Sequence, residues 1–165
     1  MIRDSSVMKR AAALLGAACL GALSSPALAA PGDKARVTGF VDIAFGTLTG
    51  ADQSSSQSVC AFSNSATSGY SVTATGNGTG GAFTLAGASP LPYEVRWAGT
   101  ANQANGTALT AGVLSSGFTS AATQQACSSG PGPTATLTVT IRAAALGSAR
   151  AGSYTGSLQI TIAPE

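Results

Sequence analysis

The chain has 165 residues, of which 44% are hydrophobic and only 8% are charged, and its formal net charge is +2. Intrinsic disorder requires low hydrophobicity and high net charge, so this composition indicates one folded domain. No block of basic residues is present that would bind a phosphate backbone, so nucleic acid is not expected as a partner. The chain also contains no histidine, the residue used most often as a general base and as a metal ligand.

The first 29 residues have the pattern of a secretory signal peptide. A positively charged region (3–10) precedes an apolar run (11–23), and the Ala-Leu-Ala at 27–29 has the small-x-small pattern of a cleavage site. We expect cleavage after Ala29, which leaves a single domain of residues 30–165. A retained membrane anchor is the alternative, but the apolar run is too short to span a bilayer and no stop-transfer pattern follows it. No later run is long enough, so no transmembrane span is expected in the mature chain.

The two cysteines of the expected mature chain are Cys60 and Cys127. An even pair of cysteines in an exported chain is typical of a structural disulfide. A metal or redox role is the weaker interpretation, because the two residues are not in a CxxC motif and no histidine could complete a zinc site. The sequence therefore predicts a disulfide between Cys60 and Cys127.

Alternation of apolar and polar residues recurs along the mature chain, with Gly, Ser, Asn or Pro between the runs. Such runs are typical of β-strands joined by turns. The alternating runs lie at 37–45, 60–62, 70–74, 83–85, 93–97, 136–142 and 158–162. In the run at 136–142, the apolar side chains are expected to face the core and the threonines (Thr136, Thr138 and Thr140) to face solvent.

The remaining segments are less regular. Residues 98–129 are expected to contain one or two short strands within long loops, and 143–149 is the only helix-like segment, with one turn at most. About seven strands and no helical pattern of ten residues predict an all-β protein, an antiparallel β-sandwich.

No catalytic or cofactor site is expected. Residues 76–81 match the dinucleotide pattern GxGxxG, but a strand pattern follows them instead of a helix, so they are interpreted as a hairpin loop. The acidic residues are scattered and no base stands beside a nucleophile, so the chain is expected not to be an enzyme. Glu94 and Arg96 are expected to form an exposed pair of little energetic value, and Trp97 to pack in the core.

Several segments of the chain form a series when they are taken in order. They are residues 43–46, 60–63, 70–72, 83–85, 91–97 and 151–158, followed by the alternating strand at 158–162. Together they resemble the spore coat protein U domain family, the family of archaic chaperone-usher pilus subunits. The likeness covers nearly the whole mature chain. Its most specific parts are the Phe-Gly at 45–46, the Leu-x-Tyr at 91–93 and the Ala-Gly-x-Tyr-x-Gly at 151–156.

The resemblance implies an immunoglobulin-like sandwich that lacks its last strand. Such a protein is exported to the periplasm, held by a chaperone that lends a strand, and assembled at an outer-membrane usher into a surface fibre (fimbrium) of like subunits by β-strand addition. The C-terminal strand would then be an unpaired edge beside an open core. The residues assigned to this edge are Tyr154, Leu158, Ile160 and Ile162.

Two interpretations of residues 37–45 remain open. If this segment is a donor strand, Val37, Val41, Ile43 and Phe45 would insert into a neighbouring subunit and the protein would polymerise. If it is the first strand of its own domain, the protein could not donate it and would be a tip-located or secreted binding module. In that case the loops at 76–81 and 100–126 would contact a glycan or a surface. The position of Cys60 also departs from the commoner family arrangement, in which the first cysteine precedes the Phe-Gly motif.

Overall fold

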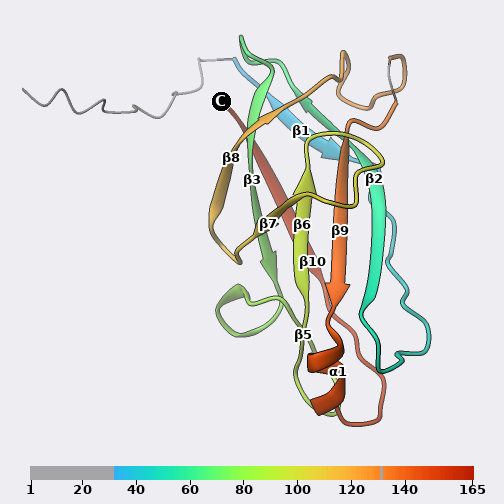
Figure 1. Cartoon of the computed structure of the whole chain (residues 1–165). Helices are drawn as coiled ribbons and strands as arrows, with labels where there is room; N and C mark the ends of the chain where they lie inside the picture. Colours follow the sequence, from blue (N-terminus) through green and yellow to red (C-terminus); the bar gives the residue numbers. More distant parts are fainter. Residues whose placement is uncertain (1–31, 131) are drawn as a thin grey trace, which may run out of the picture.

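The computed structural model of the chain describes residues 32–130 and 132–165 (Figure 1). The predicted signal peptide and its cleavage point lie outside the described residues. Within these two ranges, no helix has the length and apolar character needed to cross a membrane.

The described part of the chain is an antiparallel β-sandwich, as predicted. One sheet has the strand order β1-β2-β9-β6-β7 and the other has the order β10-β3-β8, with a separate short pair β4-β5. The strands are β1 (Ala35–Thr38), β2 (Gln53–Ser63), β3 (Gly69–Gly76), β4 (Thr84–Leu85), β5 (Leu91–Pro92), β6 (Glu94–Ala98), β7 (Thr107–Leu109), β8 (Leu114–Thr119), β9 (Ala135–Ile141) and β10 (Leu158–Pro164). Figure 1 shows the two sheets packed along the long axis of the molecule.

The strand order matches that of an immunoglobulin-like sandwich. In such domains the first, second, fifth and fourth strands form one sheet, as β1, β2, β9 and β6 do here. The second sheet of that fold has the sixth strand between the third and the seventh. Here β10 pairs with β3, but no strand in the described ranges occupies the seventh position on the other side of β10.

The core lies between the two sheets. Its largest fully buried side chains include Trp97 from the first sheet and Tyr70 from the second. The Nε1–H of Trp97 donates to the hydroxyl of Tyr70 at 3.1 Å, and the two rings meet edge to face. Trp97 is therefore a core residue, as predicted, and its polar atom is paired inside the core.

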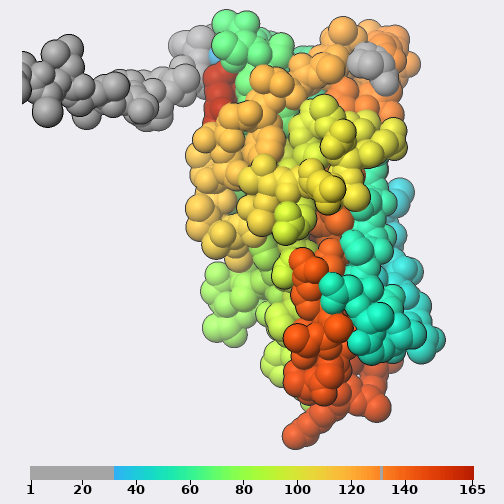
Figure 2. Space-filling view, viewed as in Figure 1, coloured from blue at the N-terminus to red at the C-terminus, as the bar shows by residue number. Residues whose placement is uncertain are grey.

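The threonines of β9 are buried, which corrects the prediction that they face solvent. Thr136, Thr138 and Thr140 are between 2% and 9% exposed. Side chains of β2 lie beside Thr138 and Thr140. The hydroxyl of Thr136 donates to the carbonyl of Thr100 at 2.8 Å, in the segment after β6, which is yellow in Figure 2. β9 lies between β2 and β6, whose side chains flank the threonines, so alternation alone could not distinguish these hydroxyls from solvated ones.

Several loop predictions are also resolved. The segment between β6 and β9 contains two short strands, β7 and β8, as expected. The helix-like segment forms α1 (Ala143–Ser148), which is longer than the single turn expected. Residues 76–81 do not form a hairpin, because β3 pairs with β8 and β10 while β4 pairs with β5; the loop contains a short 3-10 helix, η1 (Thr79–Gly81).

The predicted disulfide joins Cys60 of β2 to Cys127 of the loop that precedes β9. The Cα atoms of the two cysteines are 5.8 Å apart, within the usual range for a disulfide. The side chains on either side of Cys60, Val59 and Ala61, belong to the core cluster. The bridge therefore attaches the long loop to the face of β2 that points away from the core.

Candidate functional site

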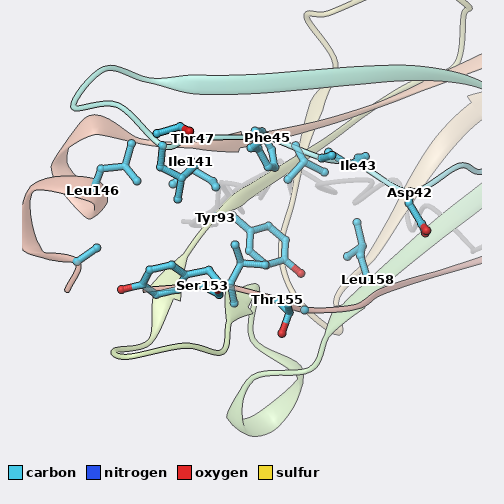
Figure 3. Close-up of a pocket in the computed structure, with 18 of the residues that line it drawn as sticks. Asp42, Ile43, Phe45, Thr47, Tyr93, Ile141, Leu146, Ser153, Thr155 and Leu158 are labelled. Atoms are coloured by element: carbon cyan, nitrogen blue, oxygen red, sulfur yellow. The ribbon is translucent and has the colours of Figure 1, made fainter. Parts of the chain in front are cut away.

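A groove of about 1430 Å³ opens along one side of the sandwich. One wall is the segment 40–50, which leads from β1 towards β2, and the other wall is residues 149–157 together with the start of β10. The floor is apolar and includes Leu137, Val139 and Ile141 of β9. In Figure 3, Ile43 and Phe45 point into the groove from one side and Leu158 from the other, with the ring of Tyr93 between them.

The first wall is extended but is not a strand. Two glycines have a positive φ, Gly39 (+90°) directly before the wall and Gly46 (+67°) within it. Within the wall, Ile43 and Phe45 are half-buried against the core, whereas Val41 is 69% exposed. Val41, predicted to share a face with Ile43 and Phe45, lines the groove with them but does not pack against the core.

The backbone of this wall is almost unpaired. Among the described residues 40–48, only Val41 forms hydrogen bonds through its backbone. Its N–H donates to Oε1 of Gln57, and its carbonyl accepts from Nε2 of the same side chain. A second glutamine of β2, Gln53, donates from its side chain to the hydroxyl of Thr49 at 2.6 Å. Side chains of β2, and not its backbone, hold the wall in place.

The second wall has a free strand edge. The N–H of Glu165 donates to the carbonyl of Gly69 at 3.0 Å, so these two residues form a hydrogen-bonded pair between β10 and β3. In an antiparallel ladder such pairs alternate with pairs that exchange no hydrogen bond. The N–H and C=O groups of Leu158, Ile160 and Ile162 consequently point away from β3, towards the groove side. Pro164 follows in the same alternation and has no N–H, as is common for proline on an edge strand.

The side chains of β10 are only half-buried on their inward face. Leu158, Ile160 and Ile162 pack against the core cluster, yet each retains exposed surface, while the residues between them face solvent. Tyr154, assigned with them to the C-terminal edge, lies outside β10, which begins at Leu158. Its hydroxyl donates to the carbonyl of Arg150 and lies 3.1 Å from that of Ser89, so it fixes the loop that forms the second wall.

The ends of the groove are marked by β1 and α1. At one end β1 pairs with β2 and contacts β10. At the other end Leu146 of α1 lines the groove. The groove therefore extends between β1 and α1.

Tyr93 places a polar atom on the floor of the groove. Its ring stacks on Phe83 with centroids 5.7 Å apart, and its hydroxyl donates to the carbonyl of Ser157 at 3.5 Å. Burial raises the pKa of this phenol above its ordinary value, so it stays neutral at physiological pH. The charged residues that line the groove, Asp42 and Arg150, are exposed. The floor thus suits apolar side chains.

A cluster of charges lies on a different face. Arg142 forms ion pairs with Asp52 at 2.9 Å and with Glu94 at 2.6 Å. The pKa of Asp52 is lowered, first by the N–H of Ala143 and then by Arg142, and the pKa of Glu94 is lowered by its hydrogen bond to Arg142. Glu94 therefore pairs with Arg142 and not with Arg96 as predicted, because Arg142 follows β9, the strand adjacent to β6.

No group of three or more His, Cys, Asp or Glu side chains among the described residues could hold a metal ion. Sequence reasoning identified Ile43, Phe45, Leu158 and Ile160 but missed Gln57, which lies in a serine-rich stretch with no pattern that would indicate a contact with Val41.

No family model and no curated protein matches the sequence. One chain of a solved structure, described as a chaperone-tip adhesin complex vital for synergistic activation of CFA/I fimbriae biogenesis, is similar over 81% of this chain with 18% sequence identity and a TM-score of 0.49. The matched region spans 41% of that chain. Because a TM-score this low does not establish a shared fold, the architecture rests on the strand pairing described above.

Proposed function

We propose that this chain is a non-enzymatic subunit of a chaperone-usher type surface fibre, and that a β-strand from a partner fills its groove. The observation that carries the proposal is the groove itself, with its apolar floor, the half-buried inward face of β10 and backbone groups without strand partners along both walls. An extended strand would satisfy these backbone groups and cover the apolar floor together.

The sequence resemblance supports the same function. The Phe-Gly at 45–46 lies in one wall of the groove and the Ala-Gly-x-Tyr-x-Gly segment at 151–156 lies in the other. The segments that carry the likeness to the spore coat protein U domain family thus meet at this site. That likeness implies export through the signal peptide, passage with a periplasmic chaperone to an outer-membrane usher, and a final position on the cell surface.

The physical chemistry of an unfilled groove also favours an escorted subunit. A strand edge with unpaired backbone groups beside apolar surface is a template for aggregation. A chaperone strand followed by a partner strand would keep this edge covered during export and assembly. The disulfide between Cys60 and Cys127 is consistent with an oxidising compartment such as the periplasm.

The test is a chain extended beyond Glu165 by a flexible linker and a strand of alternating Val and Thr. If the strand fills the groove, the melting temperature should rise by about 10 °C or more, because each buried Val contributes about 1.5 kcal/mol or more. Binding of a hydrophobic dye should fall at the same time. The matched control carries Asp in place of each Val. Equal melting temperatures for the two extended chains would reject strand filling.

A further inference from the structure

We infer that the strand that fills this groove comes from a different protein and not from a second copy of this chain. The inference rests on the proposed function and adds the identity of the partner. It decides between the two interpretations of residues 37–45. As a donor strand, this segment would make the chain polymerise with itself. Three features of the described residues support it.

The first feature is the pairing of β1 within its own domain. β1 forms an antiparallel ladder with β2 in which Ala35 lies opposite Ser63 and Thr38 lies opposite Cys60. The ladder continues before β1, where the N–H of Asn64 donates to the carbonyl of Lys34 at 3.1 Å. Withdrawal of β1 would expose the edge of β2 next to the disulfide and would remove the element that marks one end of the groove.

The second feature is the role of residues 40–50 as a wall. Ile43 and Phe45 pack against the core and point into the groove, and the backbone of Val41 is bound by Gln57. In a fibre of identical subunits, every internal subunit must accept one strand and donate another at the same time. The segment 37–45 would have to be the wall of its own groove and the filling of a neighbour's groove, and one segment cannot be in both places.

The third feature is the chemistry of the residues between the expected cleavage point and β1. Residues 30–34 are Ala-Pro-Gly-Asp-Lys, which contain a proline, a glycine and two charged side chains. Proline cannot donate to a strand ladder and charges are costly on an apolar floor, so these residues are unsuited to act as a donor.

The partner strand can be described by its chemistry. It is extended, because β10 presents the free backbone groups of Leu158 and Ile160 along the groove, and a strand of about eight residues, roughly 26 Å long, would reach past both. Alternate side chains that face the floor should be apolar and uncharged, because Leu137, Val139 and Ile141 form the floor. A side chain that faces the hydroxyl of Tyr93 could be small or polar. The structure therefore assigns this chain an acceptor role, at the end of a fibre or at a junction with a different subunit.

The experiment measures mass and binding on the mature protein, residues 30–165. Light scattering after size exclusion is recorded over a wide range of protein concentration, with and without a synthetic eight-residue peptide of alternating Val and Thr with blocked ends. A matched peptide has Asp in place of each Val. The expected result is a monomer at all concentrations that binds the Val peptide with one-to-one stoichiometry, at least about 100-fold more tightly than the Asp peptide.

The other outcomes separate this inference from the proposed function. Oligomers of the protein alone that resist mild detergent and disappear when the Val peptide is added would overturn the inference, while strand filling would still hold. A monomer that binds the two peptides equally, or neither of them, would reject strand filling and the inference with it. The extension beyond Glu165 described above provides an independent measurement of strand filling.

Discussion

The side-chain amide of Gln57 forms both hydrogen bonds with the backbone of Val41. The N–H of Val41 donates to Oε1 at 2.8 Å, and Nε2 of Gln57 donates to the carbonyl of Val41 at 3.1 Å. A primary amide has the same donor and acceptor groups as a peptide unit, so this side chain takes the place of a neighbouring strand. It holds the wall of the groove next to β2 while leaving the groove side of that wall unpaired.

The Gln57→Ala variant should loosen this wall without unfolding the protein. The loss of an exposed hydrogen bond corresponds to about 1 kcal/mol, which should accelerate amide exchange at Val41 about fivefold. The control is Gln53→Ala, which removes the contact with the hydroxyl of Thr49 and leaves both bonds of Val41 intact. Hydrogen exchange followed by NMR distinguishes the two variants. Equal exchange at Val41 in both would show that Gln57 does not hold the wall.

The charge cluster around Arg142 should make stability depend on acid pH. Asp52 and Glu94 have lowered pKa values in the folded protein, so their contribution is complete above the ordinary carboxyl pKa of about 4 and is lost as the pH falls through the lower folded values. Arg142→Gln should therefore lower the melting temperature at pH 7 and have less effect at pH 3. The effect should be small, because the side chains are about half exposed. As a control, Asp42→Asn removes a carboxylate outside the cluster and should not alter this difference.

The hydrogen bond between Trp97 and Tyr70 should be worth more than one at the surface. Tyr70→Phe would leave the Nε1–H of Trp97 without a partner in the core, at a cost of about 1–3 kcal/mol in the free energy of unfolding. Tyr154→Phe removes a hydroxyl bound at the surface of the loop and should cost less than about 1 kcal/mol. Urea unfolding of the two variants provides the comparison. Equal losses would show that the bond in the core is not critical.

The disulfide should stabilise the fold without taking part in binding. Cys60 and Cys127 are separated by 67 residues, and the chain-entropy model gives a contribution of about 4 kcal/mol for a loop of this length. Cys60→Ser and Cys127→Ser should lower the stability and periplasmic yield by similar amounts and leave the affinity for the Val peptide unchanged. Two free thiols in intact, non-reduced protein would contradict the bridge.

The fold could be predicted from the sequence because strand patterns and turn residues agree over most of the chain. Leu158, Ile160 and Ile162 alternate with polar residues, and the structure places them on the inward face of β10. The same reasoning gave a wrong prediction for the threonines of β9, which are buried. Alternation reports which side chains lie on the same face, whereas burial depends on the neighbours of that face. Here β2 lies beside Thr138 and Thr140, and the segment after β6 contacts Thr136.

The groove could be predicted only in part. The resemblance implied a missing strand beside the C-terminal strand, and the structure has a free edge at that position. It could not show that Val41 is left exposed, because exposure depends on what covers a residue and not on the alternation of the sequence. The contact between Gln57 and Val41 depends on the rotamer of one polar side chain, which no periodic pattern encodes.

The final prediction uses the two faces of β10. Ile160 faces the groove and is only half-buried without a partner, so Ile160→Asp should leave the monomer folded while placing a charge where a partner strand must pack. Affinity for the Val peptide should fall by at least about 100-fold, which corresponds to about 3 kcal/mol. Thr161→Asp is the matched control, because it introduces the same charge one residue away on the exposed face and should bind the peptide as the wild type does. Circular dichroism establishes that both variants are folded before binding is measured. Equal loss of binding in both would indicate an effect of net charge, whereas unaltered binding in Ile160→Asp would mean that the partner does not occupy this groove.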